Sequence, residues 1–143
     1  MINILTGIQN TSSALDAERT RLDVISQNIA NAHTTHDFNG QPYQRRVVVF
    51  ESVLKNAMNG DETSGNLPTT QVARIEKDTR PPVLLHDPTN SEADANGNVA
   101  MPNINIHEEM ADMISASRTY EANLAVVKNA RSMAMATLSI GRH

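Results

Sequence analysis

Hydrophobic residues recur every seven positions through the first thirty residues of the chain. The main series consists of Met1, Ile8, Leu15, Leu22 and Ile29. A second position of the repeat is partly filled, by Ile4, Ile25 and Ala32. Thr11 and Glu18 interrupt this second series. The pattern predicts a coiled-coil-like helix of roughly 45 Å, which is stable only when it packs against other helices.

The last third of the chain repeats this pattern. One heptad series consists of Ile106, Met113, Tyr120, Val127 and Ala134, and an adjacent one of Met110, Leu124 and Leu138. Glu108, Glu109 and Asp112 place negative charge in the first turns, and Gly141 stands where a helix stop is expected. We therefore predict a second long helix from about His107 to Ile140.

The segment between the helices has the character of short strands. Four stretches are β-branched or alternate with period two: YQRRVVVFESV, TQVARIEKD, PPVLLHD and GNVAMPN. The dipeptides Asn39-Gly40, Asn59-Gly60 and Asn96-Gly97 suit turns with positive φ. The polar stretch from Asn56 to Thr70 is predicted to be a mobile loop.

Together these patterns predict an α+β fold. Its N- and C-terminal helices form a coiled-coil-like hairpin, and a small β-rich segment lies between them. The expected organisation has residues 1–33 and 104–143 as the helices of one helical domain. Residues 34–103 form the middle segment, with the mobile loop at about 56–70.

Composition limits the core and the classes of partner. Of 143 residues 39% are hydrophobic, but only 3% are aromatic and none is Trp, so a modest core is expected. The net charge of -4 comes without a basic patch, which disfavours nucleic acid and anionic membrane as partners. No apolar run approaches the roughly 18 residues of a membrane span, so we do not expect a membrane-spanning protein. The N-terminus lacks the pattern of a cleaved Sec signal.

Candidate catalytic and metal motifs are incomplete. HEEMA, which starts at His107, has Ala111 where a zinc-protease helix needs its second His. His33, His36 and Asp37 lack a fourth ligand at a predictable spacing, which favours solvated loop histidines. EADANG begins like a calcium loop, but Asn103 stands where the bidentate Glu is required, which favours a simple turn. The sequence therefore supports no enzyme, no metal site and no cofactor.

Two features could serve contacts. The methionines of the C-terminal helix could form an adaptable binding groove, although their helical spacing favours a simple core role; they are Met110, Met113, Met133 and Met135. Arg45 and Arg46 beside Tyr43 could make a basic and aromatic contact point, whereas Arg beside a strand usually faces solvent. Residues off the main heptad series, namely Val24, Val126 and Met133, are predicted to be exposed in an isolated chain.

Two stretches of the chain carry a family resemblance. SALDAERTRLDVISQNIANAHTT followed by PYQRRVVVFE resembles the N-terminal signature of the bacterial flagellar axial family of rod and hook proteins. The stretches HDPTNSEADANGNVAMPN and SRTYEAN are similar to its proximal rod subunits in particular. The resemblance covers about residues 5–54 and 72–142. Gln27, the Asn39-Gly40-Gln41 segment and Asn98 depart from the usual pattern, which affects local contacts.

The resemblance implies a structural subunit of the flagellar basal body, without catalytic residues or cofactors. Such a subunit polymerises into the proximal rod, the drive shaft that transmits torque from the rotor ring to the distal rod and hook. The implied partners are other proximal rod proteins, the distal rod protein, the rod-base adaptor, the rotor (MS) ring and the flagellar type III export apparatus. The implied location is the basal body in the periplasmic space, reached through type III export without a cleaved signal.

Two groups of residues are the candidates for these roles. For helix packing and assembly they are Ile8, Leu15, Leu22, Ile29, Met113, Tyr120, Leu124, Val127 and Leu138. For the family motif and the junction between helix and β-rich segment they are Asn28, Asn31, Thr34, Thr35, Pro42, Tyr43, Pro102, Asn103 and Glu109.

The abrupt polar end of the N-terminal helix allows two interpretations. Asn28 and Asn31 could form an ordinary helix C-cap, or their side chains could also contact neighbouring subunits, as the resemblance favours. For the whole chain the alternative function is a soluble helical adaptor or chaperone-like binding module. A third possibility is a calcium- or zinc-dependent enzyme.

Overall fold

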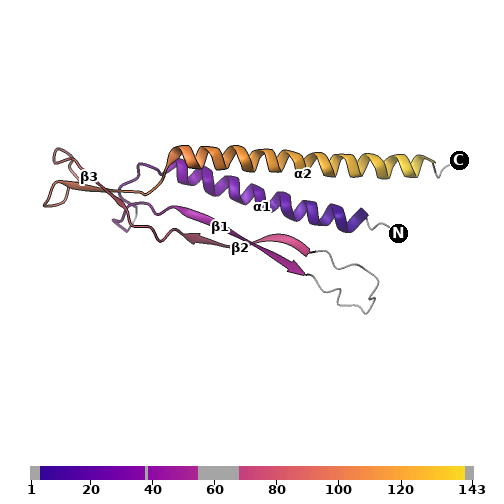
Figure 1. The fold of residues 1–143 in the computed structure, drawn as a ribbon, viewed down its shortest axis with the longest axis horizontal. Helices are drawn as coiled ribbons and strands as arrows, with labels where there is room; N and C mark the ends of the chain where they lie inside the picture. The colour runs from indigo at the N-terminus through magenta and orange to yellow at the C-terminus, as the bar shows by residue number, and fades with distance from the viewer. Residues whose placement is uncertain (1–3, 38, 55–67, 141–143) are drawn as a thin grey trace.

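The computed structural model describes residues 4–37, 39–54 and 68–140 as an elongated arrangement of two helices and two small sheets (Figure 1). The elements are α1 Ile4–Ala30, β1 Arg46–Leu54, β2 Pro68–Lys77, β3 Val83–His86, β4 Asn98–Met101 and α2 Ile106–Ile140. The predicted α+β class is confirmed. Each predicted helix and strand is present within a few residues of its expected bounds.

The elements form three layers with α1 in the middle. Figure 1 shows α1 and α2 running antiparallel, with the β1–β2 hairpin along the other side of α1. Both ends of the described chain lie at one end of the molecule, and the β3–β4 hairpin projects from the other. Because α1 is covered from two sides, a wider part of its surface is buried than one heptad stripe would give.

The buried residues show this effect. The buried apolar side chains of the described residues are Ala17, Val24, Ile25, Ala32, Val99 and Ala116. Val24 is only 4% exposed, so the prediction that it would be exposed is wrong, because both neighbouring layers cover α1. The core is modest, as the low aromatic content predicted.

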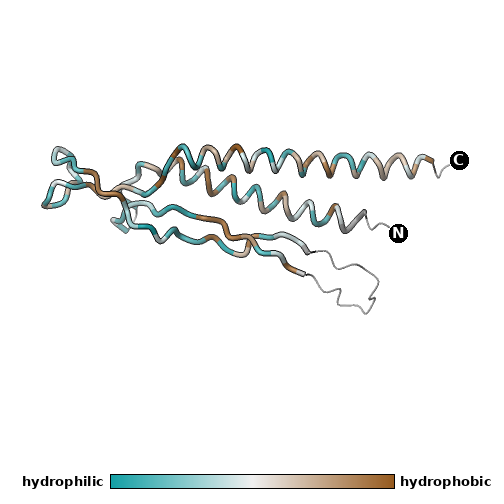
Figure 2. Tube along the Cα trace, viewed as in Figure 1, coloured by the Kyte–Doolittle hydropathy of each residue, from teal (hydrophilic) through white to brown (hydrophobic). Residues whose placement is uncertain are grey.

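The outer helix α2 keeps most of its apolar side chains at the surface. Val126 and Met133 are 54% and 65% exposed, as predicted for residues off the main heptad series. Figure 2 shows hydrophobic positions recurring along the whole length of α2, including the part farthest from the β-rich end. Neither described helix is both long and apolar enough to cross a membrane.

The β1–β2 sheet is antiparallel and irregular at one point. Its register pairs Arg46 with Lys77 at one end and Leu54 with Pro68 at the other, and it shifts between Val49 and Phe50. The hydroxyl of Thr69, in β2, donates to Asn10 Oδ1 of α1 at 2.7 Å. This bond joins the far end of the sheet to the middle layer.

Glycine sets two of the turns. Gly40 and Gly97 have φ of 71° and 74°, which confirms the turns predicted at Asn39-Gly40 and Asn96-Gly97. Asn59-Gly60 lies outside the described residues. So does most of the loop predicted for residues 56–70, but its last three residues belong to β2, so that boundary was wrong.

Gly97 offers a test of the hairpin geometry. We expect Gly97→Ala to destabilise the β3–β4 hairpin by about 1–2 kcal/mol, because an L side chain is strained at positive φ. Its Cβ would also lie 3.1 Å from the Pro88 Cβ. The Asp87 amide donates to the Gly97 carbonyl, so faster hydrogen exchange at this amide reports local unfolding of the hairpin.

Gly40→Ala and Gly7→Ala serve as controls. Gly40 also has positive φ, but there is open space around it. The loss of stability in Gly97→Ala beyond that in Gly40→Ala therefore measures the contact with Pro88. Gly7 lies in helix α1 with open space, and Ala there should stabilise the helix by roughly 1 kcal/mol. Unchanged exchange at Asp87 in Gly97→Ala would contradict the geometry.

Candidate functional site: a buried polar junction

The side-chain amide of Asn28 connects α1 to the start of β1. Its Nδ2 donates to the Arg46 carbonyl at 2.9 Å and to Glu109 Oε2 at 3.0 Å. Its Oδ1 accepts from the Arg46 N–H at 2.9 Å and from the Tyr43 hydroxyl at 3.1 Å. All four hydrogen-bonding positions of the amide are therefore used, and it pairs with Arg46 as a neighbouring strand would.

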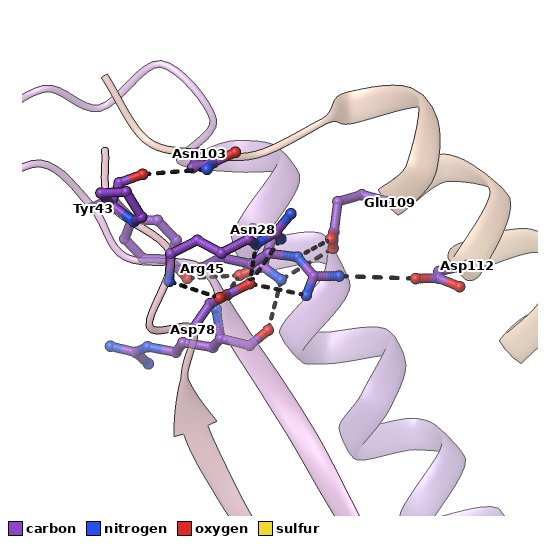
Figure 3. A network of polar contacts seen from close by, with 10 residues as sticks. Asn28, Tyr43, Arg45, Asp78, Asn103, Glu109 and Asp112 are labelled. Atoms are coloured by element: carbon purple, nitrogen blue, oxygen red, sulfur yellow. Dashed lines mark hydrogen bonds and ion pairs between the residues drawn. The ribbon is translucent and has the colours of Figure 1, made fainter. Parts of the chain in front are cut away.

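Glu109 brings α2 into the same cluster. Its side chain is 1% exposed, and its Oε1 accepts from Arg45 Nε at 2.6 Å (Figure 3). The helix begins where the Asn105 side chain accepts from the His107 N–H at 3.1 Å, so Glu109 lies in the first turns of α2. There the helix dipole also favours a carboxylate.

Arg45 links this carboxylate to two others. Its guanidinium lies 3.6 Å from Asp78 Oδ2 and 4.0 Å from Asp112 Oδ2. Asp112 is also 3.6 Å from Arg21 of α1. With a side chain only 20% exposed, Arg45 has a single positive charge placed among three carboxylates from two parts of the chain.

Two residues of this cluster have shifted pKa values. Hydrogen bonds from the Arg80 side chain and backbone N–H lower the pKa of the Asp78 carboxyl below its ordinary value. Burial raises the pKa of Tyr43, although the nearby Arg46 guanidinium, 5.9 Å from the ring centre, opposes the shift. The Tyr43 hydroxyl thus keeps the proton that it donates to Asn28.

We call this cluster of six residues the polar junction: Asn28, Tyr43, Arg45, Arg46, Asp78 and Glu109. It joins α1, α2 and the β1–β2 sheet at the point where the layers meet. A groove of about 290 Å³ beside it is lined partly by Val24 and Phe50. Since its buried carboxylate is bound by Arg45 and Asn28, the junction is suited to fixing the layers, not to acid–base chemistry.

The end of α1 is capped from within the chain. Asn31 Nδ2 donates to the Gln27 carbonyl at 2.8 Å, and its Oδ1 accepts from the Thr34 hydroxyl at 3.3 Å. No described residue other than glycine has positive φ, so α1 does not end in a residue of left-handed conformation. Asn28, at 1% exposure, has no surface to offer a neighbouring subunit, which corrects that interpretation for Asn28.

The remaining junction candidates lie on both sides of this cluster. The Thr35 hydroxyl and His36 Nδ1 both contact Glu92 in the β3–β4 connection. Asn103 Nδ2 donates to the Pro81 carbonyl at 3.2 Å, and Pro102 is buried. Pro42 lines a small pocket of about 50 Å³ with Tyr43 and Asn103.

The helix-packing candidates divide into two groups. Eight of them are half-buried: Ile8, Leu15, Leu22, Ile29, Met113, Tyr120, Leu124 and Val127. Leu138 is 67% exposed, so in the isolated chain α1 does not cover it. Within the described residues, no group of three or more His, Cys, Asp or Glu side chains is arranged so that it could hold a metal ion.

Sequence reasoning missed Asp78, and for Arg45 it favoured a side chain that faces solvent over a specific contact. A signal was available in α2. Glu109 lies three residues after Ile106 and four before Met113, so the heptad spacing places it in the apolar stripe predicted to pack on the other helix. A carboxylate in such a stripe requires a cationic or hydrogen-bonding partner elsewhere in the chain.

Comparisons with known proteins agree on one family. Residues 8–35 match the family described as flagella basal body rod protein, and residues 95–140 match the flagellar basal body rod FlgEFG protein C-terminal family. The flagellar basal-body rod protein FlgC of Borreliella burgdorferi is 40% identical over 97% of this chain and 98% of its own length. FlgC of Bacillus subtilis is 38% identical over 92% of this chain and 94% of its own. FlgC of Salmonella typhimurium is 40% identical over 91% and 92%.

Removing the Glu109 carboxylate should weaken all three layers. We expect Glu109→Ala to destabilise the chain by about 3 kcal/mol, because it leaves Arg45 and Asn28 without their acceptor in a largely buried site. Glu108→Ala is the matched control, since Glu108 is exposed in the same first turn and contributes mainly through the helix dipole, about 0.5 kcal/mol. Urea unfolding followed by circular dichroism gives both values. Equal losses would contradict a special role for Glu109.

The lowered pKa of Asp78 predicts that the stability of the folded chain depends on pH. Because its pKa in the folded chain is below the ordinary value of 3.8, its contribution is present above about pH 5 and is lost as the pH falls through the folded pKa. Wild type should therefore be more stable than Asp78→Asn at neutral pH, and the difference should shrink below pH 3.8. Thermal unfolding of both proteins across this range measures it. A difference that grows on acidification would show the opposite sign of shift.

Proposed function

The chain belongs to the family of flagellar basal-body rod proteins of the FlgC type, and we propose that it is a structural subunit of the proximal rod. In this role it polymerises with other rod proteins into the drive shaft that carries torque from the rotor ring to the distal rod and hook. Relatives named as rod proteins cover nearly all of the chain, which supports this function.

One surface of α2 carries the proposal. Val126, Met133 and Ile140 are seven residues apart, so they share one face of the helix, and they are 54%, 65% and 76% exposed. We name them the heptad stripe. An exposed apolar stripe with heptad spacing is the pattern through which helices of separate chains pack. Helices of neighbouring subunits would bury it in the rod.

The polar junction would hold the three layers of such a subunit together under torque. Torque applied to the helices must also reach the β-rich layer, and the bonds of Asn28, Arg45 and Glu109 join the three layers. Hydrogen-bonded and ion-paired contacts are directional, so they resist sliding of the layers more than apolar contacts of the same area do. Many such subunits side by side would share the torsional load.

The proposed partners are the other proximal rod proteins, the distal rod protein, the rod-base adaptor and the rotor (MS) ring. The chain would reach them in the periplasmic space through the flagellar type III export apparatus, without a cleaved signal. We propose no catalytic activity and no cofactor, because the buried carboxylate of the junction is already bound within the chain. Val24 and Leu22 would pack inside the subunit, and the heptad stripe of α2 would pack between subunits.

A polar substitution in the heptad stripe tests the proposal. In cells whose only copy carries Val126→Asp, we expect motility to be lost and the amount of the chain in purified basal bodies to fall at least tenfold. The reason is that a carboxylate would be buried between helices without a partner.

Ala125→Asp is the matched control. Ala125 is exposed on the same turn, but it lies about 100° around the helix from Val126. Circular dichroism of both purified variants checks that the fold is retained. Normal motility with Val126→Asp would refute assembly through this stripe, and absence of the wild-type chain from basal bodies would refute the function itself.

A further inference from the structure

The β3–β4 hairpin lies at the end of the molecule opposite to both ends of the described chain (Figure 1), and its apolar side chains are exposed. Val83, Leu84 and Leu85 are 50%, 64% and 51% exposed. Consecutive apolar residues on a projecting two-stranded sheet are unfavourable in water unless a partner covers them. We name residues 83–97, which comprise β3 and the connection to β4, the hairpin tip.

The hairpin tip is also acidic. Residues 87–97 contain Asp87, Glu92 and Asp94 and no Lys or Arg. Hydrogen bonds from Thr89 lower the pKa of Asp87, and the hydrogen bond from Thr35 does the same for Glu92. Both carboxylates therefore carry their charge at neutral pH. An acidic rim beside an apolar strand favours a partner surface that is both basic and apolar.

The tip is held in one shape before any partner binds. Side-chain oxygens of Asp87, Asn90 and Asp94 accept from the backbone N–H groups of Thr89, Glu92 and Asn96 at 3.1, 3.0 and 2.8 Å. The Asp94 carboxylate also accepts from the Asn98 N–H at 2.9 Å. A preformed loop loses little conformational entropy on binding, as a docking surface requires.

The last half of α2 carries the complementary combination at the opposite end of the molecule. From Ala122 to Ile140 the charged residues are Lys128 and Arg131 alone, and both are basic. Spacings of three, four and three residues place Lys128, Arg131, Met135 and Leu138 on one helix face. All four are exposed, with Met135 at 61% and Leu138 at 67%. We name this set the basic stripe; it lies on a different face of α2 from the heptad stripe.

We propose that the hairpin tip of one copy of this chain docks on the basic stripe of the next copy. Leu84 would pack against Met135 and Leu138, while Val83 and Leu85 lie on the other face of the strand, and the acidic loop would face Lys128 and Arg131. The two surfaces cannot meet within one chain, because α2 alone separates them by tens of ångströms: its 35 residues span about 50 Å. A head-to-tail contact of this kind does not close on itself, so it extends an axial array.

This contact rests on the proposed rod function and adds to it the longitudinal neighbour and the face that it uses. The heptad stripe would serve lateral packing, whereas the basic stripe would serve contacts along the axis. The tip is also tied back to the end of α1 through the contacts of Thr35 and His36 with Glu92. Force on the tip would thereby reach α1.

Disulfide cross-linking in assembled basal bodies tests the contact, since the natural chain has no cysteine. The test variant carries Leu84→Cys and Met135→Cys in the full chain, as the only copy in the cell. A disulfide forms only when the Cα atoms approach to about 7 Å. The control carries Leu84→Cys and Met133→Cys, because Met133 is equally exposed but lies on the opposite face of α2.

We expect covalent dimers of the chain from the Leu84–Met135 variant after mild oxidation, at least fivefold more than from the Leu84–Met133 control. Equal yields from both variants, or cross-links to a different protein alone, would overturn the proposal. If the chain is present in the basal bodies but forms no dimer, this contact fails and the rod function stands. If the chain is absent from wild-type basal bodies, the rod function itself fails.

Charge reversal on the same background separates docking from mere proximity. Adding Lys128→Glu and Arg131→Glu should lower the dimer yield several-fold, because like charges would then face the acidic loop. Adding Lys128→Arg and Arg131→Lys should leave the yield unchanged. A yield insensitive to the reversal would contradict the charge complementarity on which the proposal depends.

Discussion

The arrangement of this chain depends on the hydrogen bonds between the Asn28 side chain and both backbone groups of Arg46. Through them a helix residue takes the place of a neighbouring strand at the beginning of β1. Glu109 then bonds the same amide and Arg45, so the start of α2 is fixed to the same point. Each group in this set is satisfied only when all three layers are in place, which makes one relative position of the layers strongly preferred.

A small apolar core makes this polar control important. The buried apolar side chains of the described residues include three alanines, which contribute little apolar area, so many shifts of one layer past another would differ little in buried surface. A buried amide and carboxylate change this, because each shift would leave a buried polar group without a partner. Specificity of position thus comes from the junction, and much of the apolar surface of α2 stays available for contacts between chains.

The exposed apolar surface of α2 distinguishes a rod subunit from an adaptor. A soluble adaptor would bury its apolar helix face against a client, whereas relatives of this chain along nearly its whole length are named as rod proteins. The apolar side chains of α2 lie on more than one face of the helix, as packing among several neighbours requires. The polar junction keeps the subunit a single unit while those faces remain open.

The sequence by itself determined the elements, because heptad spacing, period-two alternation and Asn-Gly turns are local patterns. The helices, the four strands and the turns at Gly40 and Gly97 were predicted in this way, and motif resemblance alone identified the family. Only the tertiary structure decided that α1 is a middle layer, so that Val24 is buried, and that Arg45 points inward to Glu109. Both outcomes depend on contacts between residues that are distant in the sequence, such as Arg45 and Glu109, and no local periodicity encodes such pairs.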